Sequence, residues 1–140
     1  MRTLIINMLL KKLIKNLPRV KKDIVVKGLA TDSKKIKKGF IFFAIRGFKS
    51  NGERFIKEAI EKGAIAIVCS KQCSFSHQEI PIVKSTNTRR LLSEISSKFY
   101  KLKPKNIIAI TGTNGKASVA DFFYQILDIN NVPVASIGTL

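Results

Sequence analysis

The chain has 140 residues, 45% of them hydrophobic and 25% charged, a composition that excludes a disordered protein and suits one ordinary folded core. Its 26 Lys and Arg residues against 9 Asp and Glu residues give a formal net charge of +17, which would suit an anionic partner such as nucleic acid, acidic lipid or a phosphorylated substrate. Because the lysines are scattered rather than interleaved with aromatic residues, we interpret the charge as compositional and expect no nucleic-acid partner.

Signals for a membrane, metal or redox protein are weak. No apolar run approaches the roughly 20 residues needed to span a bilayer, so we expect no membrane span. Cys69, Cys73 and His77 are the only cysteines and the only histidine. Two thiols at this spacing form no disulfide framework and lack further zinc ligands, so we expect core or loop positions for all three residues. Free thiols without a signal sequence predict a cytoplasmic protein.

Residues 1–23 are predicted to be an N-terminal extension built around an amphipathic helix over residues 1–17. Leucine, isoleucine and methionine recur there at helical spacing, and Pro18 ends the pattern. Lys11 and Lys12 interrupt the apolar stretch, which argues against a signal peptide. A targeting or membrane-surface role stays open as the alternative.

Residues 24–103 predict a small α/β domain with a largely parallel sheet, because apolar runs alternate with helical patterns. The expected strands lie at residues 24–26, 40–45, 64–68 and 81–83, the second of them buried on both faces. The expected helices lie at residues 55–60 and 86–100, and Gly63 is expected to end the first. Residues 31–35 are predicted to form a polar turn, because Asp32 and Ser33 can bond nearby backbone amides.

A step in charge supports a domain boundary near residues 101–105. Residues 1–105 carry 25 Lys and Arg against 7 Asp and Glu, whereas residues 106–140 carry one Lys against two Asp. Pro104 lies at this step and favours a break in secondary structure. We therefore expect a second, incomplete domain over residues 104–140.

The second domain is predicted to contain a strand, a phosphate loop, a helix and a further strand. The apolar run at residues 106–110 suits a buried parallel strand, residues 119–129 suit a helix with one apolar face, and residues 132–137 suit the last strand. In the loop between the first two, glycines permit a tight turn, and backbone amides can point at phosphate oxygens near the helix N-terminus. The candidate nucleotide-binding residues are Gly112, Thr113, Asn114, Gly115, Lys116, Ala117 and Ser118, with Lys116 stabilising the β- and γ-phosphates.

One position departs from the usual phosphate loop. The residue after the loop lysine ordinarily supplies a hydroxyl to the Mg²⁺ of the nucleotide, but Ala117 has no oxygen. Ser118 comes next, and one step along a helix rotates a side chain by about 100°. Ser118 is therefore a candidate metal ligand only if the loop shifts. We expect the loss of the usual hydroxyl to weaken metal-dependent phosphoryl transfer more than it weakens nucleotide binding.

Three segments together resemble one known family. Thr-Gly-Thr-Asn-Gly-Lys at residues 111–116 resembles the ATP loop of the Mur ligases, which build the peptide of bacterial cell-wall precursors. Residues 31–47 and 51–64 resemble the UDP-sugar-binding N-terminal domain of that family. The combination resembles most the MurE-type branch, the UDP-N-acetylmuramoyl-tripeptide synthetases, over roughly residues 24–140.

The resemblance implies an ATP- and Mg²⁺-dependent ligase that adds meso-diaminopimelate or L-lysine to UDP-MurNAc-L-Ala-D-Glu through an acyl phosphate. Residues 24–103 would bind the UDP-MurNAc-dipeptide, and residues 104–140 would begin the central ATPase domain. The implied substrate-binding residues are Thr31, Ser33, Phe48, Lys49 and Ser50. Members of the family run to several hundred residues, so we expect this N-terminal portion to be inactive in ligation alone. A non-catalytic UDP-sugar- or nucleotide-binding remnant is the alternative.

Overall fold

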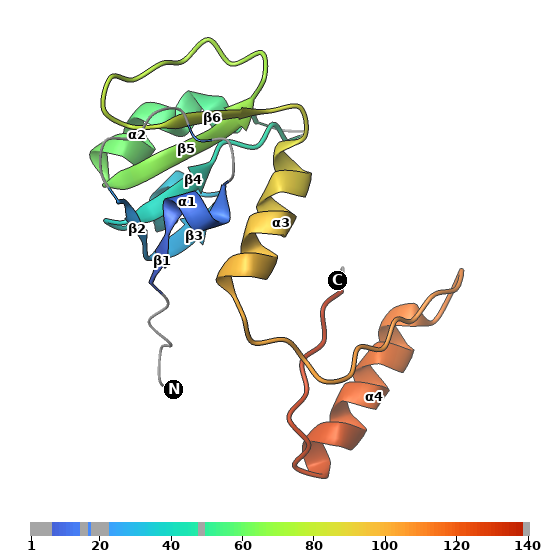
Figure 1. Ribbon diagram of the computed structural model, residues 1–140. Helices are drawn as coiled ribbons and strands as arrows, with labels where there is room; N and C mark the ends of the chain where they lie inside the picture. Colours follow the sequence, from blue (N-terminus) through green and yellow to red (C-terminus); the bar gives the residue numbers. More distant parts are fainter. Residues whose placement is uncertain (1–6, 15–16, 18–22, 48–49, 139–140) are drawn as a thin grey trace. The chain divides into compact units, whose positions relative to one another are not determined.

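The computed structural model describes residues 7–14, 17, 23–47 and 50–138, and the chain divides into two units, one ending at Leu102 and one beginning at Lys103 (Figure 1). At the N-terminus, the helix expected over residues 1–17 is wrong for the described part. There, β1 (Met8–Leu9) leads directly into α1 (Leu10–Leu13), and Ile14 is already extended. The other residues of that stretch, apart from Asn7 and Leu17, lie outside the described residues.

The first unit is built on a parallel sheet of four strands in the order β3 (Gly28–Ala30), β4 (Phe40–Phe43), β5 (Ala64–Ser70) and β6 (Ile82–Ser85). The helix α2 (Ile56–Glu61) connects β4 to β5, and α3 (Thr88–Phe99) follows β6. A separate antiparallel pair joins β1 to β2 (Val25–Val26). The expected parallel α/β domain is therefore confirmed, while β3 went unpredicted.

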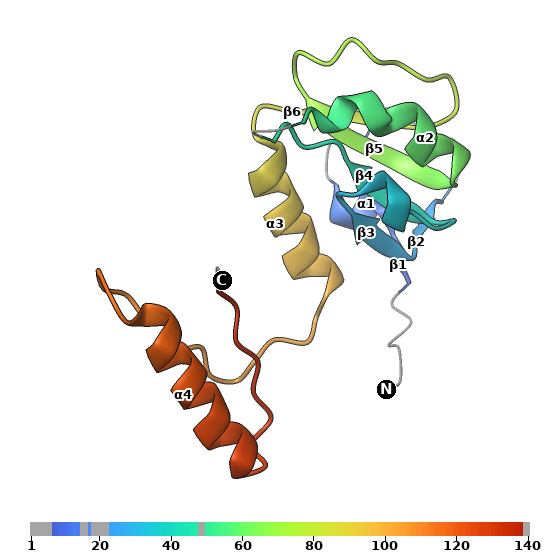
Figure 2. The same cartoon turned by 180° about the vertical axis from the view of Figure 1, so that it is seen from behind.

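Both faces of the sheet are covered because the central strands β4 and β5 are apolar on both sides. Ile41 and Phe43 of β4 pack with α1 and α3, whereas Phe42 and Ala44 pack with α2 on the opposite face. Figure 2 shows α2 in front of the sheet, and Figure 1 shows α1 and α3 on the other side. The expectation that residues 40–45 are buried on both faces is confirmed for residues 41–44.

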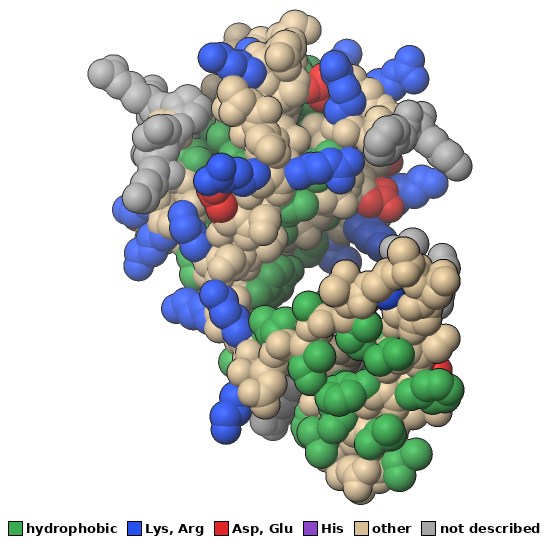
Figure 3. Space-filling model, turned by 90° about the vertical axis from the view of Figure 1, so that its right-hand side faces the viewer, with side chains coloured by type: hydrophobic (Ala, Val, Ile, Leu, Met, Phe, Trp, Pro, Cys, Tyr) green, Lys and Arg blue, Asp and Glu red, His purple; other side chains and the backbone are tan. Residues whose placement is uncertain are grey.

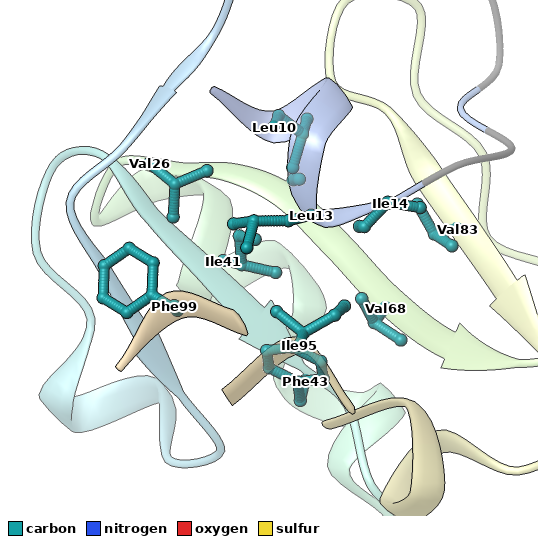
Figure 4. Packing of buried hydrophobic residues seen from close by; sticks show 11 residues of the cluster. Leu10, Leu13, Ile14, Val26, Ile41, Phe43, Val68, Val83, Ile95 and Phe99 are labelled. Atoms are coloured by element: carbon teal, nitrogen blue, oxygen red, sulfur yellow. The ribbon is translucent and has the colours of Figure 1, made fainter. Parts of the chain in front are cut away.

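The core beneath α1 and α3 contains the larger share of the buried side chains (Figure 4). Leu10 and Leu13 of α1 lie over one end of this cluster, and Ile95 and Phe99 of α3 pack against the same strands. The buried members are Leu10, Leu13, Ile14, Val26, Ile41, Phe43, Ala66, Val68, Val83, Ile95 and Phe99. The helix α1 has only four residues, which are too few for an independently stable helix. Packing against this core therefore stabilises it.

The second core cluster lies between the sheet and α2, and it contains both cysteines. Cys69 and Cys73 are buried and reduced, so the expectation of a core position for them is confirmed. Burial raises the pKa of the Cys69 thiol to about 12, and the neighbouring Cys73 contributes to that rise. His77 lies in the connection before β6, where its Nδ1 accepts hydrogen bonds from the backbone amides of Glu79 and Ile80.

The second unit contains one helix, α4 (Lys116–Ile129), which confirms the helix expected there. The strands expected at residues 106–110 and 132–137 are wrong for the described chain, since both stretches lack strand pairing. A strand forms only when a neighbour completes its ladder of hydrogen bonds, and these two runs have no such neighbour among the described residues. The apolar side chains of this unit therefore remain on its surface, as Figure 3 shows. Ile107 is 81% exposed and Phe122 is 63% exposed.

Across the part of the chain that the structure describes, no helix has both the length and the apolar character required to cross a bilayer.

Candidate functional site

The carboxyl ends of the four parallel strands bring distant segments to one edge of the first unit. β3 leads into the turn at residues 31–35, β4 into the loop at residues 44–52, β5 ends at Ser70, and β6 ends at Ser85. Ligands of open parallel sheets bind outside this edge, because the loops that follow the strands meet there. The implied substrate residues all fall on the first two of these segments.

The turn after β3 has the polar architecture that its sequence predicts. Asp32 caps a short 3₁₀ turn, η1 (Ser33–Lys35): its Oδ1 accepts a hydrogen bond from the Lys34 amide at 2.9 Å, and its carbonyl accepts from the Lys35 amide at 3.0 Å. Thr31 is exposed, whereas Ser33 is only 5% exposed. The structure therefore offers Thr31 to solvent and turns Ser33 inward.

Ser33 is the start of a hydrogen-bonded chain that reaches α2. Its Oγ donates to Glu58 Oε2 at 2.8 Å, and Lys62 Nζ donates to Glu58 Oε1 at 2.5 Å. Hydrogen bonds from Lys62 and then from Ser33 hold the pKa of Glu58 below its ordinary value. Sequence reasoning missed Glu58; its spacing of four residues from Lys62 marks a helical ion pair but gives no hint of Ser33.

An open depression of about 730 Å³ lies beside the same turn, between β3 and α3. Thr31 lines it, but Ser33 and Ser50 do not. The lining residues are Leu29, Ala30, Thr31, Asp32, Lys34, Lys35, Lys37, Phe40, Leu92, Ser96 and Tyr100. Three lysines against one aspartate, whose side chain already caps η1, make this depression suited to an anionic ligand.

The loop after β4 is closed by backbone hydrogen bonds. The Gly47 amide donates to the Ser50 carbonyl at 2.9 Å, and the Gly52 amide donates to the Ile45 carbonyl at 3.0 Å. A Cβ on Gly52 would lie 2.6 Å from the Ile45 oxygen, so only glycine allows this close approach. Ser50 is exposed. Phe48 and Lys49, two implied substrate residues, lie outside the described residues.

A second carboxylate, Glu53, ties this loop to the end of β5. Its backbone amide donates to Asn51 Oδ1 at 3.1 Å, its Oε1 accepts from the Ser70 amide at 3.2 Å, and Arg46 lies 3.9 Å from its Oε2. Burial raises the pKa of Glu53, but Ser70 and Asn51, with the charge of Arg46, outweigh burial and leave that pKa below its ordinary value. The Ser70 amide is the firm contact, because Ser70 Oγ is buried without a well-formed hydrogen bond in the described structure.

The phosphate loop of the second unit has the backbone that a tight anion-binding turn needs. Gly112 has φ +153° and Gly115 has φ +75°, and the latter is the left-handed residue that immediately precedes α4. Nothing lies within 4 Å of a Cβ placed on Gly115, so backbone conformation, and not space, favours glycine there. The first amides of α4 point out of the helix end and are free to meet an anion.

Lys116 is the first residue of α4, and its side chain folds back on the loop. Its Nζ donates to the carbonyls of Gly112 and Thr113, the latter at 3.1 Å. Ala117 and Ser118 follow in the first helical turn, and both are exposed. The loop fits a phosphate group, but it does not fit Mg²⁺ in the usual way: Ala117 offers no oxygen, and the described residues contain no cluster of three or more His, Cys, Asp or Glu around a possible ion.

Comparison with known proteins identifies the family of the chain. The profile of the Mur ligase family, catalytic domain, matches residues 25–100. The UDP-N-acetylmuramoyl-L-alanyl-D-glutamate--2,6-diaminopimelate ligases of Zymomonas mobilis and Brucella melitensis are 43% and 34% identical to the chain over 85% and 84% of its length. The chain spans about a quarter of each relative, 24%. Among solved structures, the MurF ligase of Thermotoga maritima in complex with ADP is similar in fold, with 23% identity, a TM-score of 0.60 and coverage of 72% of this chain and 23% of that one.

Proposed function

Since this chain belongs to the Mur ligase family, we propose that it is the N-terminal part of the ATP-dependent ligase that adds the third amino acid to UDP-MurNAc-L-Ala-D-Glu in peptidoglycan precursor synthesis. That amino acid is diaminopimelate in the named relatives. The observation that carries the proposal is the extent of the match. A matched stretch of 119 residues cannot fit within the 102 residues of the first unit, so the similarity also enters the unit that contains the phosphate loop.

The two units have different proposed roles. The carboxyl edge of the parallel sheet binds the nucleotide sugar, with Thr31 and Ser50 exposed on the two segments that follow β3 and β4. Phe48 and Lys49 belong to the same proposed site by resemblance. The second unit binds the polyphosphate of ATP through the amides of residues 112–118, and Lys116 leaves its carbonyl partners to neutralise the β- and γ-phosphates. The proposed use of ATP and of a nucleotide sugar favours a cytoplasmic protein.

The metal is the weakest part of the proposed chemistry. Mg²⁺ would supply positive charge beside the phosphates, but the loop position that ordinarily offers it a hydroxyl is Ala117, which has no oxygen. Ser118 lies one residue further along α4, on a different side of the helix. This substitution specifically favours a second candidate function, a binding module that retains the nucleotide sugar and has lost phosphoryl transfer.

Separate calorimetric titrations of UDP-MurNAc-L-Ala-D-Glu and of ATP test the proposal. We expect the nucleotide sugar to bind the 140-residue chain, and we expect ATP binding to weaken in Lys116→Ala but not in the matched control Lys105→Ala, which removes a charge outside the loop. An assay for ligation by these 140 residues alone is expected to show no product. Binding of neither ligand, with tight and salt-dependent binding of RNA instead, would refute the proposal.

Restoration of a hydroxyl separates the two candidate functions. Ala117→Thr should strengthen the Mg²⁺ dependence of ATP binding if the loop otherwise retains ligase geometry. If Ala117→Thr leaves both ATP affinity and its Mg²⁺ dependence unchanged, the binding module is the better description.

A further inference from the structure

The strand β3 forms one edge of the parallel sheet, and its outer side has no strand neighbour among the described residues. The antiparallel pair of β1 and β2 ends at Val26, and only Lys27 separates it from β3. The three residues of β3, Gly28, Leu29 and Ala30, include no charged side chain and no proline, the residues that commonly prevent an exposed edge from pairing. The backbone of β3 is therefore available to another extended segment.

The depression beside the turn after β3 also follows this free edge. Leu29 packs with the core cluster on the α1 and α3 face of the sheet, and Ala30 packs with the cluster on the α2 face, yet both line the depression. Since alternate residues of a strand lie on opposite faces, one depression meets both faces only around the edge of the strand. Phe40 of β4 reaches the same place because its ring lies over Gly28, where an added Cβ would be 2.5 Å from it.

The helix α3 supplies the opposite wall of the depression (Figure 1). Leu92, Ser96 and, at the helix end, Tyr100 line it at a spacing of four residues, which places them on one side of α3. A peptide that added a strand to β3 would therefore lie between an open backbone edge and a helical stripe. Its alternate side chains would be directed toward Leu92 and Tyr100.

The charge of the depression selects among possible occupants. Lys34, Lys35 and Lys37 line it, whereas its one acidic lining residue, Asp32, already accepts a hydrogen bond from the Lys34 amide. A second copy of this chain is disfavoured, because each copy carries a formal net charge of +17. Nucleic acid and polyphosphate match the lysines but have no peptide backbone to pair with β3. An acidic peptide matches the lysines and the strand edge together.

We propose that the free edge of β3 and the facing stripe of α3 form a docking groove for an extended, acidic segment of a partner protein. The segment adds a strand to β3, packs apolar side chains against Leu92 and Tyr100, and brings carboxylates to Lys35 and Lys37. Three residues of β3 offer only about two or three backbone hydrogen bonds, so the interaction is weak and reversible unless further contacts support it.

A titration of the full chain with short peptides, followed by amide NMR, tests the proposal. The probe is a blocked peptide of about six residues in which glutamate alternates with valine, since this is the usual length of a strand. We expect amide shifts and slower hydrogen exchange at one or more of residues 28–30. The same peptide with N-methyl groups on alternate residues should bind about tenfold more weakly, because it lacks the backbone donors. A peptide in which lysine alternates with valine should not bind.

Filling the groove from α3 gives a matched pair of variants. Ser96 lines the depression, so Ser96→Trp should weaken binding of the acidic peptide by about tenfold or more. The next residue, Ser97, is exposed and does not line the depression, so Ser97→Trp should retain the wild-type affinity. Thermal melts by circular dichroism verify that both variants are folded.

Charge reversal tests the lysines without relying on the helix. The double variant Lys35→Glu/Lys37→Glu should lose most of the affinity for the acidic peptide at low salt. Lys57→Glu/Lys71→Glu changes the net charge by the same amount at two exposed positions outside the depression, and it should lose much less. Equal losses in the two double variants would overturn the proposal.

The remaining outcomes assign the groove to other occupants, and each overturns the proposal. Equal affinity for the N-methylated peptide, or full affinity in Ser96→Trp, would show that charge alone attracts the peptide. Displacement by inorganic pyrophosphate at the concentration of the peptide would indicate a small-anion site. A dimer in sedimentation that Ser96→Trp abolishes and Ser97→Trp retains would identify a second copy of this chain as the occupant.

Discussion

The two units have similar sequence patterns, but the side chains of the first are buried and those of the second are exposed. The buried hydrophobic residues of the described chain all lie in the first unit, at positions from Leu10 to Phe99, whereas α4 of the second unit has no buried residue. Both units contain apolar runs at strand and helix spacing. The difference is that β4 and β5 have neighbours on both edges and helices on both faces, so their apolar side chains leave water. An apolar pattern stabilises a fold only when a second layer covers it.

The largest expected difference between the units is in amide hydrogen exchange. Amides of β5 should exchange only through global unfolding, with a free energy of about 5 kcal/mol or more, since β5 lies between β4 and β6. Amides of α4 should open at about 1 kcal/mol or less, because an isolated helix of this length is marginal in water. Exchange followed by mass spectrometry on the whole chain measures both. Equal protection of the β5 and α4 amides would contradict this difference between the units and show that α4 is covered in solution.

Truncation of one phenylalanine in each unit sharpens the same contrast. Phe43 is fully buried, so Phe43→Ala should lower the free energy of unfolding by about 3–5 kcal/mol. Phe122 is 63% exposed, so Phe122→Ala should change it by less than about 0.5 kcal/mol. Urea denaturation monitored by circular dichroism gives both values. A loss above about 1 kcal/mol for Phe122→Ala would show that this side chain has a partner.

Helix capping gives a smaller effect. Asn87 Oδ1 accepts a hydrogen bond from the Arg90 amide at 2.9 Å and begins α3, whereas Gly115 begins α4 without a side-chain cap. Asn87→Ala should therefore cost about 1 kcal/mol in urea denaturation. Asn114→Ala, next to the uncapped helix, is the matched control and should leave the unfolding free energy unchanged. An equal loss in both variants would contradict the assignment of Asn87 as the cap.

The smallest expected effect is a pH dependence that belongs to the first unit. The pKa of Glu53 in the folded chain is lower than the ordinary 4.5, so its contribution to stability is complete above pH 4.5 and is lost as the pH falls through the folded pKa. The melting temperature of Glu53→Gln should therefore lie below that of wild type at pH 7, and the gap should narrow below pH 4.5. If the difference in melting temperature stayed constant from pH 7 to pH 3, ionisation of Glu53 would not be the source of the pH dependence.

Local patterns in the sequence predict the elements of the first unit well. The apolar runs at β4 and β5 and the polar turn at η1 were identifiable because each depends on neighbouring residues: a continuous apolar run in each strand, and the Asp32 cap in the turn. β3 was missed since three residues that begin with a glycine make too short a pattern. The strands at 106–110 and 132–137 were wrongly predicted for a different reason, because pairing depends on a neighbour that a local pattern cannot supply.

The residues of the candidate site also differ in whether a local sequence pattern predicts them. Thr31 and the phosphate loop follow from local motifs, and the structure places the first at an exposed turn and the second at the start of α4. Glu58 and Glu53 were beyond reach of the sequence. The partners of these carboxylates, Ser33 and Ser70, lie 25 and 17 residues away along the chain. Only the folded sheet brings such pairs together.

Lys116 makes ligand binding in the second unit an exchange. Its ammonium group already has two oxygen partners in the loop, the carbonyls of Gly112 and Thr113. A phosphate that enters must replace these carbonyls, so the measured affinity will be the difference between two sets of hydrogen bonds to one ammonium group. Without a ligand, the same two carbonyl dipoles solvate the ammonium group and hold the loop closed around its own lysine. Removal of the Lys116 side chain would therefore loosen the empty loop and also weaken the binding of the nucleotide.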